Sequence, residues 1–237
     1  MQLRAPKGGL SLRMAALFLS LTVSAAAAPE LEAKLRLYKP DCSSADIPDV
    51  EAAIHGASAL LKSCCQLSLR YEGHQSLPLD SQWCHLPDSP VESSKALQAL
   101  AAQAKAHHPR ELALFLLPSS ADQRLSWALV DTSLRSACDS PQERRFLARF
   151  GNIFFTDLTW MQAADGKEPS RAALLVAHEV LHSLTQRGHP TGTEPGSVMA
   201  DHVAGLGPKI GEDWCACARR SPYVSPLPTP TPAPRHP

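Results

Sequence analysis

Residues 172–182 read AALLVAHEVLH, an apolar run that carries His178, Glu179 and His182. Side chains four residues apart lie on one face of an α-helix, so both imidazoles could reach a single metal ion. A glutamate beside them could take a proton from the water that completes the coordination of a catalytic zinc. The spacing therefore predicts a helix that binds Zn²⁺ through His178 and His182, with Glu179 as the catalytic general base.

The residues that follow this run must supply a third metal ligand, because a catalytic zinc normally has three protein ligands. Gly188 could end the helix with a positive φ and turn the chain so that His189 points at the ion. His189 is therefore our first choice as third ligand. Three other donors lie within reach along the chain and stay open as alternatives: Glu194, Asp201 and His202.

The chain before the histidine run alternates between strand-like and helix-like patterns. Alternating or short apolar runs predict strands at residues 33–38, 67–71, 111–117, 127–130 and 152–155, and helical spacing predicts helices at 49–61 and 93–107. Pro169 and Ser170 suit the start of the histidine helix, and Gly188 suits its end. Strands mixed with helices predict an α+β fold with the histidine helix packed against a sheet.

The N-terminus has the order of a secretory signal peptide. Arg4, Lys7 and Arg13 precede an uncharged run, MAALFLSLTVSAAAA, that ends in small residues at Ala28. We expect residues 1–28 to be removed and the protein to be secreted, with no stable membrane anchor. Their removal takes the charge balance from 23 basic against 23 acidic residues to 20 against 23. A net charge near −3 argues against nucleic acid as a partner.

All seven cysteines follow the predicted signal peptide, in a compartment where disulfides persist. Three disulfides and one remaining thiol would account for them, and the sequence does not choose the pairing. Neither Cys64 with Cys65 nor Cys215 with Cys217 suits a local bridge.

The C-terminus is rich in proline from Pro222 onwards. Such a segment cannot build a core, so we expect residues 223–237 to form a disordered tail or linker. One compact domain is then expected over residues 29–222.

The histidine run and the residues after it resemble the metzincin family of zinc peptidases, whose motif is HExxHxxGxxH followed by a methionine turn. His178, Glu179 and His182 match that motif, His189 looks like its third histidine shifted by one residue, and residues 197–200 (SVMA) look like the turn. The resemblance implies a zincin-like mixed sheet with an active-site helix and a short C-terminal subdomain. It also implies that Met199 lies beneath the imidazoles.

Another branch of zincins takes a glutamate from a later helix as third ligand, and Glu212 is the candidate here. With either ligand, the resemblance and the motif together predict a secreted zinc-dependent endopeptidase that acts on a protein or peptide substrate. The rival hypothesis is a secreted, disulfide-stabilised binding protein in which the helix holds a structural or vestigial metal site.

Overall fold

A computed structural model describes residues 30–40, 47–77, 90–117, 126–128, 138, 151–155, 169–189, 195–200 and 205–227 of the 237-residue chain. These residues form a six-stranded mixed sheet in the order β2-β1-β3-β5-β4, with β6 paired to β1. The strands are β1 (Leu31–Pro40), β2 (Leu67–Leu77), β3 (Leu112–Leu116), β4 (Ser126–Ala128), β5 (Asn152–Phe155) and β6 (Val224–Pro226). Strands β1, β2, β3 and β5 are parallel, and β4 and β6 run antiparallel to their neighbours.

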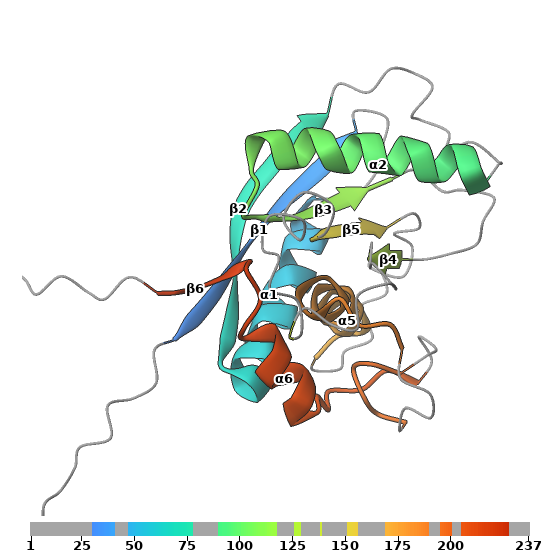
Figure 1. Cartoon of the computed structure of the whole chain (residues 1–237). Helices are drawn as coiled ribbons and strands as arrows, with labels where there is room; N and C mark the ends of the chain where they lie inside the picture. Colours follow the sequence, from blue (N-terminus) through green and yellow to red (C-terminus); the bar gives the residue numbers. More distant parts are fainter. Residues whose placement is uncertain are drawn as a thin grey trace, which may run out of the picture.

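Helices cover both faces of the sheet (Figure 1). The helices are α1 (Ile47–Cys65), α2 (Pro90–His107), α5 (Arg171–Thr185) and α6 (Glu212–Ala218). Helix α2 lies on one face, and α1 and α5 pack together on the other, with α6 beside them. The predicted mixed α+β fold with a histidine-bearing helix against a sheet is confirmed.

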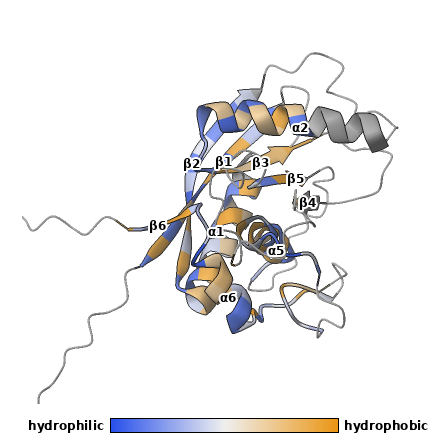
Figure 2. Ribbon diagram, in the orientation of Figure 1, coloured by the Kyte–Doolittle hydropathy of each residue, from blue (hydrophilic) through white to orange (hydrophobic). Residues whose placement is uncertain are grey.

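Strand β3 shows how one apolar run serves both faces. Leu112, Leu114 and Leu116 join the larger core between the sheet and the helices α1 and α5, whereas Ala113 and Phe115 join a smaller core beneath α2. A parallel strand that is buried on both faces needs a continuous apolar sequence rather than an alternating one. The run LALFL meets that need, and Figure 2 shows β3 coloured hydrophobic along its visible length.

The smaller core is built on a row of stacked rings across three strands. Phe115 of β3 stacks on Tyr38 of β1 at 5.0 Å between ring centroids and on Phe154 of β5 at 4.9 Å. The same residues are paired in the strand register, so the stacking fixes which residues of the three parallel strands lie opposite each other. Leu100, Ala101 and Ala104 of α2 complete this core.

The predicted strands and helices all have counterparts in the structure, with shifted ends. Helix α1 begins at Ile47, before the expected Asp49, which lies in its first turn. The larger difference concerns the expected tail: Val224 to Pro226 form β6 and pair antiparallel with β1, and the backbone N–H of Leu227 donates to the carbonyl of Glu30. Backbone hydrogen bonds between two strands do not require apolar side chains, so the proline-rich composition gave no sign of β6. Residues 228–237 lie outside the described ranges.

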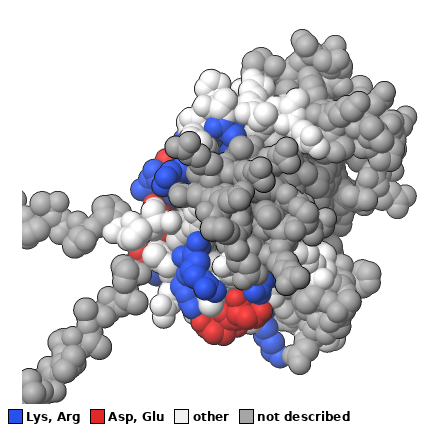
Figure 3. All heavy atoms as spheres, viewed as in Figure 1, with Lys and Arg blue, Asp and Glu red and all other residues white. Residues whose placement is uncertain are grey.

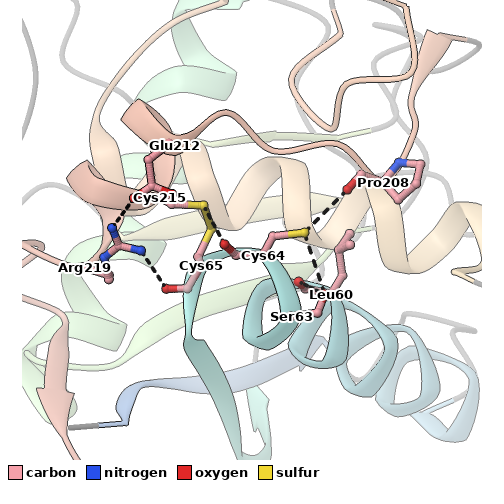
Figure 4. The surroundings of a disulfide bond; sticks show 8 residues. All are labelled: Leu60, Ser63, Cys64, Cys65, Pro208, Glu212, Cys215 and Arg219. Carbon is pink, nitrogen blue, oxygen red and sulfur yellow. Dashed lines mark hydrogen bonds and ion pairs between the residues drawn. A yellow bond between two sulfur atoms is a disulfide. The ribbon is translucent and has the colours of Figure 1, made fainter. Parts of the chain in front are cut away.

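Two disulfides connect distant parts of the described chain. Cys65, at the end of α1, is bonded to Cys215 of α6 (Figure 4). Cys138 is bonded to Cys217. Cys64 is a free thiol, so neither adjacent pair forms a local bridge, as expected. The other two cysteines, Cys42 and Cys84, lie outside the described residues.

The predicted signal peptide, residues 1–28, also lies outside the described residues. Among the residues that are described, no helix has both the length and the apolar character that crossing a membrane requires.

Candidate metal centre

Helix α5 carries the histidine motif through the interior of the protein. It begins after Ser170, whose Oγ accepts a hydrogen bond from the backbone N–H of Ala173 at 3.2 Å. Every residue from Ala172 to Thr185 is buried. A helix packed on all sides has little freedom to shift, so its side chains are held on a rigid element.

The end of α5 differs from the sequence prediction. The helix ends at Thr185, and Gln186 takes the left-handed conformation with φ 55°, donating its backbone N–H to the carbonyl of His182. Gly188, the residue we expected to have a positive φ, is not among the positive-φ residues of the described chain. The chain therefore leaves the helix earlier than predicted, because a polar residue can take this conformation when its backbone is hydrogen-bonded.

His178, His182 and His189 come together at this end of the helix. One ring nitrogen from each lies within 4.8 Å of the other two. His178 and His182 are buried, whereas His189 is exposed. The early turn at Gln186 thus brings His189 to the two helical histidines, and the three rings form the one group of this kind found among the described residues that could hold a metal ion.

Hydrogen bonds orient the two buried rings. The Nδ1 of His178 lies 2.6 Å from the carbonyl oxygen of Val198, and the Nδ1 of His182 lies 2.5 Å from that of Arg187. A carbonyl oxygen can only accept, so each Nδ1 carries the proton and each Nε2 keeps its lone pair. The two Nε2 atoms face each other at 3.1 Å. Two lone pairs at this separation suit one shared cation.

The surroundings keep His182 neutral. Burial, followed by the neighbouring His178, lowers the pKa of His182 from 6.5 to about 3, and the hydrogen bond to Arg187 opposes that change only in part. A neutral imidazole is the form that binds a metal ion. At neutral pH the ring is therefore ready to bind without first losing a proton.

Glu179 follows His178 on α5, and it is 4% exposed. A buried carboxylate can accept a proton from a nearby donor and return it. The helix thus supplies two ring nitrogens and one buried carboxylate within five consecutive residues.

The segment predicted to resemble a methionine turn supports His178 through its backbone. Val198, whose carbonyl accepts from His178, is tied to a second segment because its N–H donates to the carbonyl of Lys209 at 2.8 Å. Met199 is 1% exposed, and its N–H donates to the Oγ of Ser197. Met199 therefore lies directly beside the carbonyl that orients His178.

Of the alternative third ligands, the described residues include Glu212 alone, and it does not belong to the three-histidine group. Glu212 instead pairs at 2.5 Å with Arg219, the C-cap residue of its helix, and its side chain is 75% exposed. In this structure Glu212 is therefore not placed as the later glutamate of the zincin arrangement would be. Glu194, Asp201 and His202 lie outside the described residues.

Sequence reasoning missed Arg187, Val198 and Trp214 as parts of this site. Arg187 and Val198 contribute carbonyl oxygens, which every residue has, so no sequence pattern could single them out. The Trp214 ring of α6 lies 6.1 Å from that of His182, edge to face. A tryptophan 32 residues after a histidine gives no sign of this contact before the chain is folded.

Comparisons with known proteins find solved structures that are similar to this chain in fold. No protein-family model matches the sequence, and no curated protein matches it either. Among solved structures, the chain is similar to metalloproteinase-II from Bacteroides fragilis, with a TM-score of 0.52 and 12% identity over 80% of this chain. It is also similar to archaemetzincin from Methanopyrus kandleri, with a TM-score of 0.51 and 14% identity over 80% of this chain and 94% of that one.

The match covers 52% of metalloproteinase-II, so this chain spans about half the length of that protein. The chain shares its fold with these two structures. At such low identity the likeness concerns the arrangement of strands and helices, and the chemistry must be argued from the side chains of this chain.

Proposed function

We propose that this protein is a secreted zinc-dependent endopeptidase in which His178, His182 and His189 bind the metal ion. The observation that carries the proposal is the convergence of three imidazoles, two of them fixed so that their Nε2 atoms face each other at 3.1 Å. Three protein ligands leave a coordination position open, as in catalytic rather than structural zinc sites.

The donor set fits zinc in type and spacing. Zinc–nitrogen bonds of about 2.0–2.1 Å at tetrahedral angles place two ligand nitrogens roughly 3.3 Å apart. The observed 3.1 Å between the Nε2 atoms of His178 and His182 is close to that value. Each of these rings also donates its other N–H to a backbone carbonyl, which is the usual outer partner of a metal-bound histidine.

The roles of this chain's residues in peptide hydrolysis follow from their positions. When bound, zinc lowers the pKa of a bound water and polarises the carbonyl of the scissile peptide bond. Glu179 takes the proton of the attacking water on its carboxylate and then delivers a proton to the leaving amine. The carbonyls of Val198 and Arg187 keep the two buried rings in one tautomer throughout.

The comparisons support the same class of reaction. One solved structure with this fold is a metalloproteinase and another is an archaemetzincin. A protein or peptide is therefore the expected substrate class here.

The location and boundaries of the enzyme rest on sequence patterns. We infer that residues 1–28 are a signal peptide, that the peptidase domain follows, and that the mature protein has no stable membrane anchor. Disulfides Cys65–Cys215 and Cys138–Cys217 agree with an oxidising compartment. The proline-rich residues that follow β6 would form the tail.

The decisive experiment measures zinc content and hydrolysis of casein or gelatin by purified residues 29–237, with and without a chelator. We expect one zinc per chain and hydrolysis that the chelator abolishes. Glu179→Gln should keep the zinc and lose nearly all turnover, and His178→Ala should lose the zinc. His55→Ala, which removes an exposed histidine from α1, is the matched control and should change neither.

Three outcomes would contradict the proposal in different ways. A chain without zinc would remove its premise. Substantial hydrolysis by purified Glu179→Gln would exclude Glu179 as the general base. One zinc with no hydrolysis, and with spectroscopic evidence for four protein ligands, would favour the rival binding protein with a closed metal site.

A further inference from the structure

We propose that Arg187 is a positioning residue of the metal centre, held in place by Asp213 and Trp214 of α6. Its carbonyl orients His182, and two residues later the chain reaches His189. The inference rests on the proposed function, in which these histidines bind zinc, and it assigns a role to a helix that contributes no ligand itself.

The side chain of Arg187 contacts α6, and its backbone carbonyl contacts His182. Its Nη1 donates to Oδ2 of Asp213 at 2.9 Å, and its guanidinium carbon lies 5.5 Å from the centroid of the Trp214 ring. Its carbonyl oxygen accepts from Nδ1 of His182 at 2.5 Å. The Trp214 ring also meets the His182 ring edge to face. Arg187 therefore links α6 directly to a metal-site imidazole.

The segment that carries His189 reaches the surface soon after α5 ends. The helix has already ended at Thr185, and Gly188 and His189 are both exposed. The backbone N–H of Arg187 makes a long contact of 3.4 Å with Oγ1 of Thr185. Each contact that holds a short exposed segment reduces its conformational freedom. The Arg187 guanidinium supplies such a contact, to Asp213 and Trp214 of α6.

Helix α6 is fixed well enough to hold Arg187 in place. We call the contacts of the Arg187 side chain with Asp213 and Trp214 the clamp. Cys215 is bonded to Cys65 at the end of α1, and Arg219 donates from Nη1 to the carbonyl of Cys65 at 3.2 Å (Figure 4). Trp214 is 7% exposed and belongs to the larger core. Because its rigidity comes from α1 and the core, α6 holds its place independently of the histidine segment.

Two acidic residues lie next to each other at the start of α6. Glu212 and Asp213 lie in its first turn, and Figure 3 shows acidic atoms gathered between basic ones at the corresponding end of the molecule. The two carboxylates have different partners: Glu212 pairs with Arg219 at the C-cap of α6, and Asp213 pairs with Arg187 in the segment after α5. Their side chains are similarly exposed, at 75% and 68%, so they form a matched pair for mutation.

The test measures the zinc dissociation constant of the full chain by competition with a chromophoric chelator, together with the unfolding midpoint of the zinc-free protein. We expect Arg187→Ala to weaken zinc binding about tenfold, the lower end for loss of an outer partner of a metal ligand. The zinc-free midpoint should stay the same, because the clamp orders a segment outside the core. The zinc affinity of Arg187→Lys should lie between those of the wild type and Arg187→Ala, since lysine keeps the charge but loses the planar contact with Trp214.

Matched variants of α6 separate the clamp from general effects of charge. Asp213→Asn should weaken zinc binding several-fold, and Glu212→Gln should leave it unchanged. Cobalt in place of zinc gives a second readout, because its visible spectrum responds to ligand geometry. The spectrum should change in Arg187→Ala and stay the same in Glu212→Gln.

Several results would overturn the inference without touching the proposed function. Unchanged zinc affinity and an unchanged cobalt spectrum in Arg187→Ala would show that the segment holds its place without the clamp. An equal loss in Asp213→Asn and Glu212→Gln would reveal a charge effect only, and an affinity loss matched by a lower zinc-free midpoint would make Arg187 a structural residue. Absence of zinc from the wild-type chain would instead defeat the proposed function.

Discussion

Gly56 of α1 faces Ala173 of α5 so closely that a Cβ added to Gly56 would lie 2.7 Å from the Cβ of Ala173. Neither atom could move aside, because both are fixed to helix backbones. The glycine therefore sets how closely α1 approaches the helix that carries His178 and His182. Close approach of α1 is one reason that α5 is buried along its whole length.

Gly56→Ala should lower the free energy of unfolding by about 1–3 kcal/mol, because the two helices must separate. Helix propensity alone would favour the alanine by about 1 kcal/mol, so the sign of the change tests the contact. Urea unfolding of Gly56→Ala, Ala173→Gly and the double variant measures it. Strongly non-additive effects are expected: the double variant should lose less unfolding free energy than the two single variants lose together. Additive effects would argue against a direct contact.

Gly207→Ala should disturb the metal centre through the segment that supports His178. A Cβ at this position would lie 2.4 Å from the carbonyl oxygen of Gly196, within the backbone pairing that also holds Val198. We expect a loss of about 1–3 kcal/mol in unfolding free energy and weaker zinc binding. Gly205→Ala is the control, since its Cβ would make an ordinary contact of 3.5 Å with Ala200. Equal effects of the two substitutions would contradict the steric explanation.

Lys105 gives the stability of the fold a defined pH dependence. Its Nζ donates to the carbonyl of Glu111 and lies 4.5 Å from the centroid of the Tyr223 ring. Burial lowers the pKa of Lys105 from 10.5 to about 7, and Glu111 opposes the change. Between about pH 7 and 10.5 the unfolded chain therefore holds a proton that the folded chain has released.

Stability should thus rise with pH across that window, by at most about 1.4 kcal/mol per pH unit from this one group. Lys105→Met should remove this part of the slope in urea unfolding measured between pH 7 and 10. Lys62→Met changes a lysine whose side chain is 58% exposed at the end of α1 and should retain it. A slope unchanged by Lys105→Met would mean that the buried amine does not titrate in this range.

The adjacent cysteines at the end of α1 should respond differently to substitution. Cys65→Ser opens the bridge to Cys215, which joins residues 150 positions apart, and should cost about 2–5 kcal/mol. Cys64→Ser replaces a free thiol whose polar contacts, the Oγ of Ser63 and the carbonyl of Pro208, are both long at 3.7 Å, and it should cost little. Melting temperatures of the two variants, with peptide mapping of the disulfides, measure this difference. A larger loss in Cys64→Ser would assign the bridge to the other cysteine.

The sequence contains enough information for most of the strands and helices, because their signals are local. The run at β3 is continuously apolar and is buried on both faces, and the histidine helix has its predicted serine cap at Ser170. The short strand β6 was missed because its partner, β1, lies almost 200 residues earlier in the chain. The prediction that Gly188 ends the helix was wrong, because Gln186 makes the turn with its backbone N–H bonded to the carbonyl of His182.

The placing of His178, Glu179 and His182 on one buried helix could be read from their spacing alone, since helix geometry is the same in every protein. Tertiary structure alone determined the rest of the site. It brought His189 to the helical pair, chose Val198 and Arg187 as carbonyl partners, and set α6 against the segment that carries His189. These contacts join residues from separate segments through backbone atoms and exposed turns, which have no periodic pattern in a sequence.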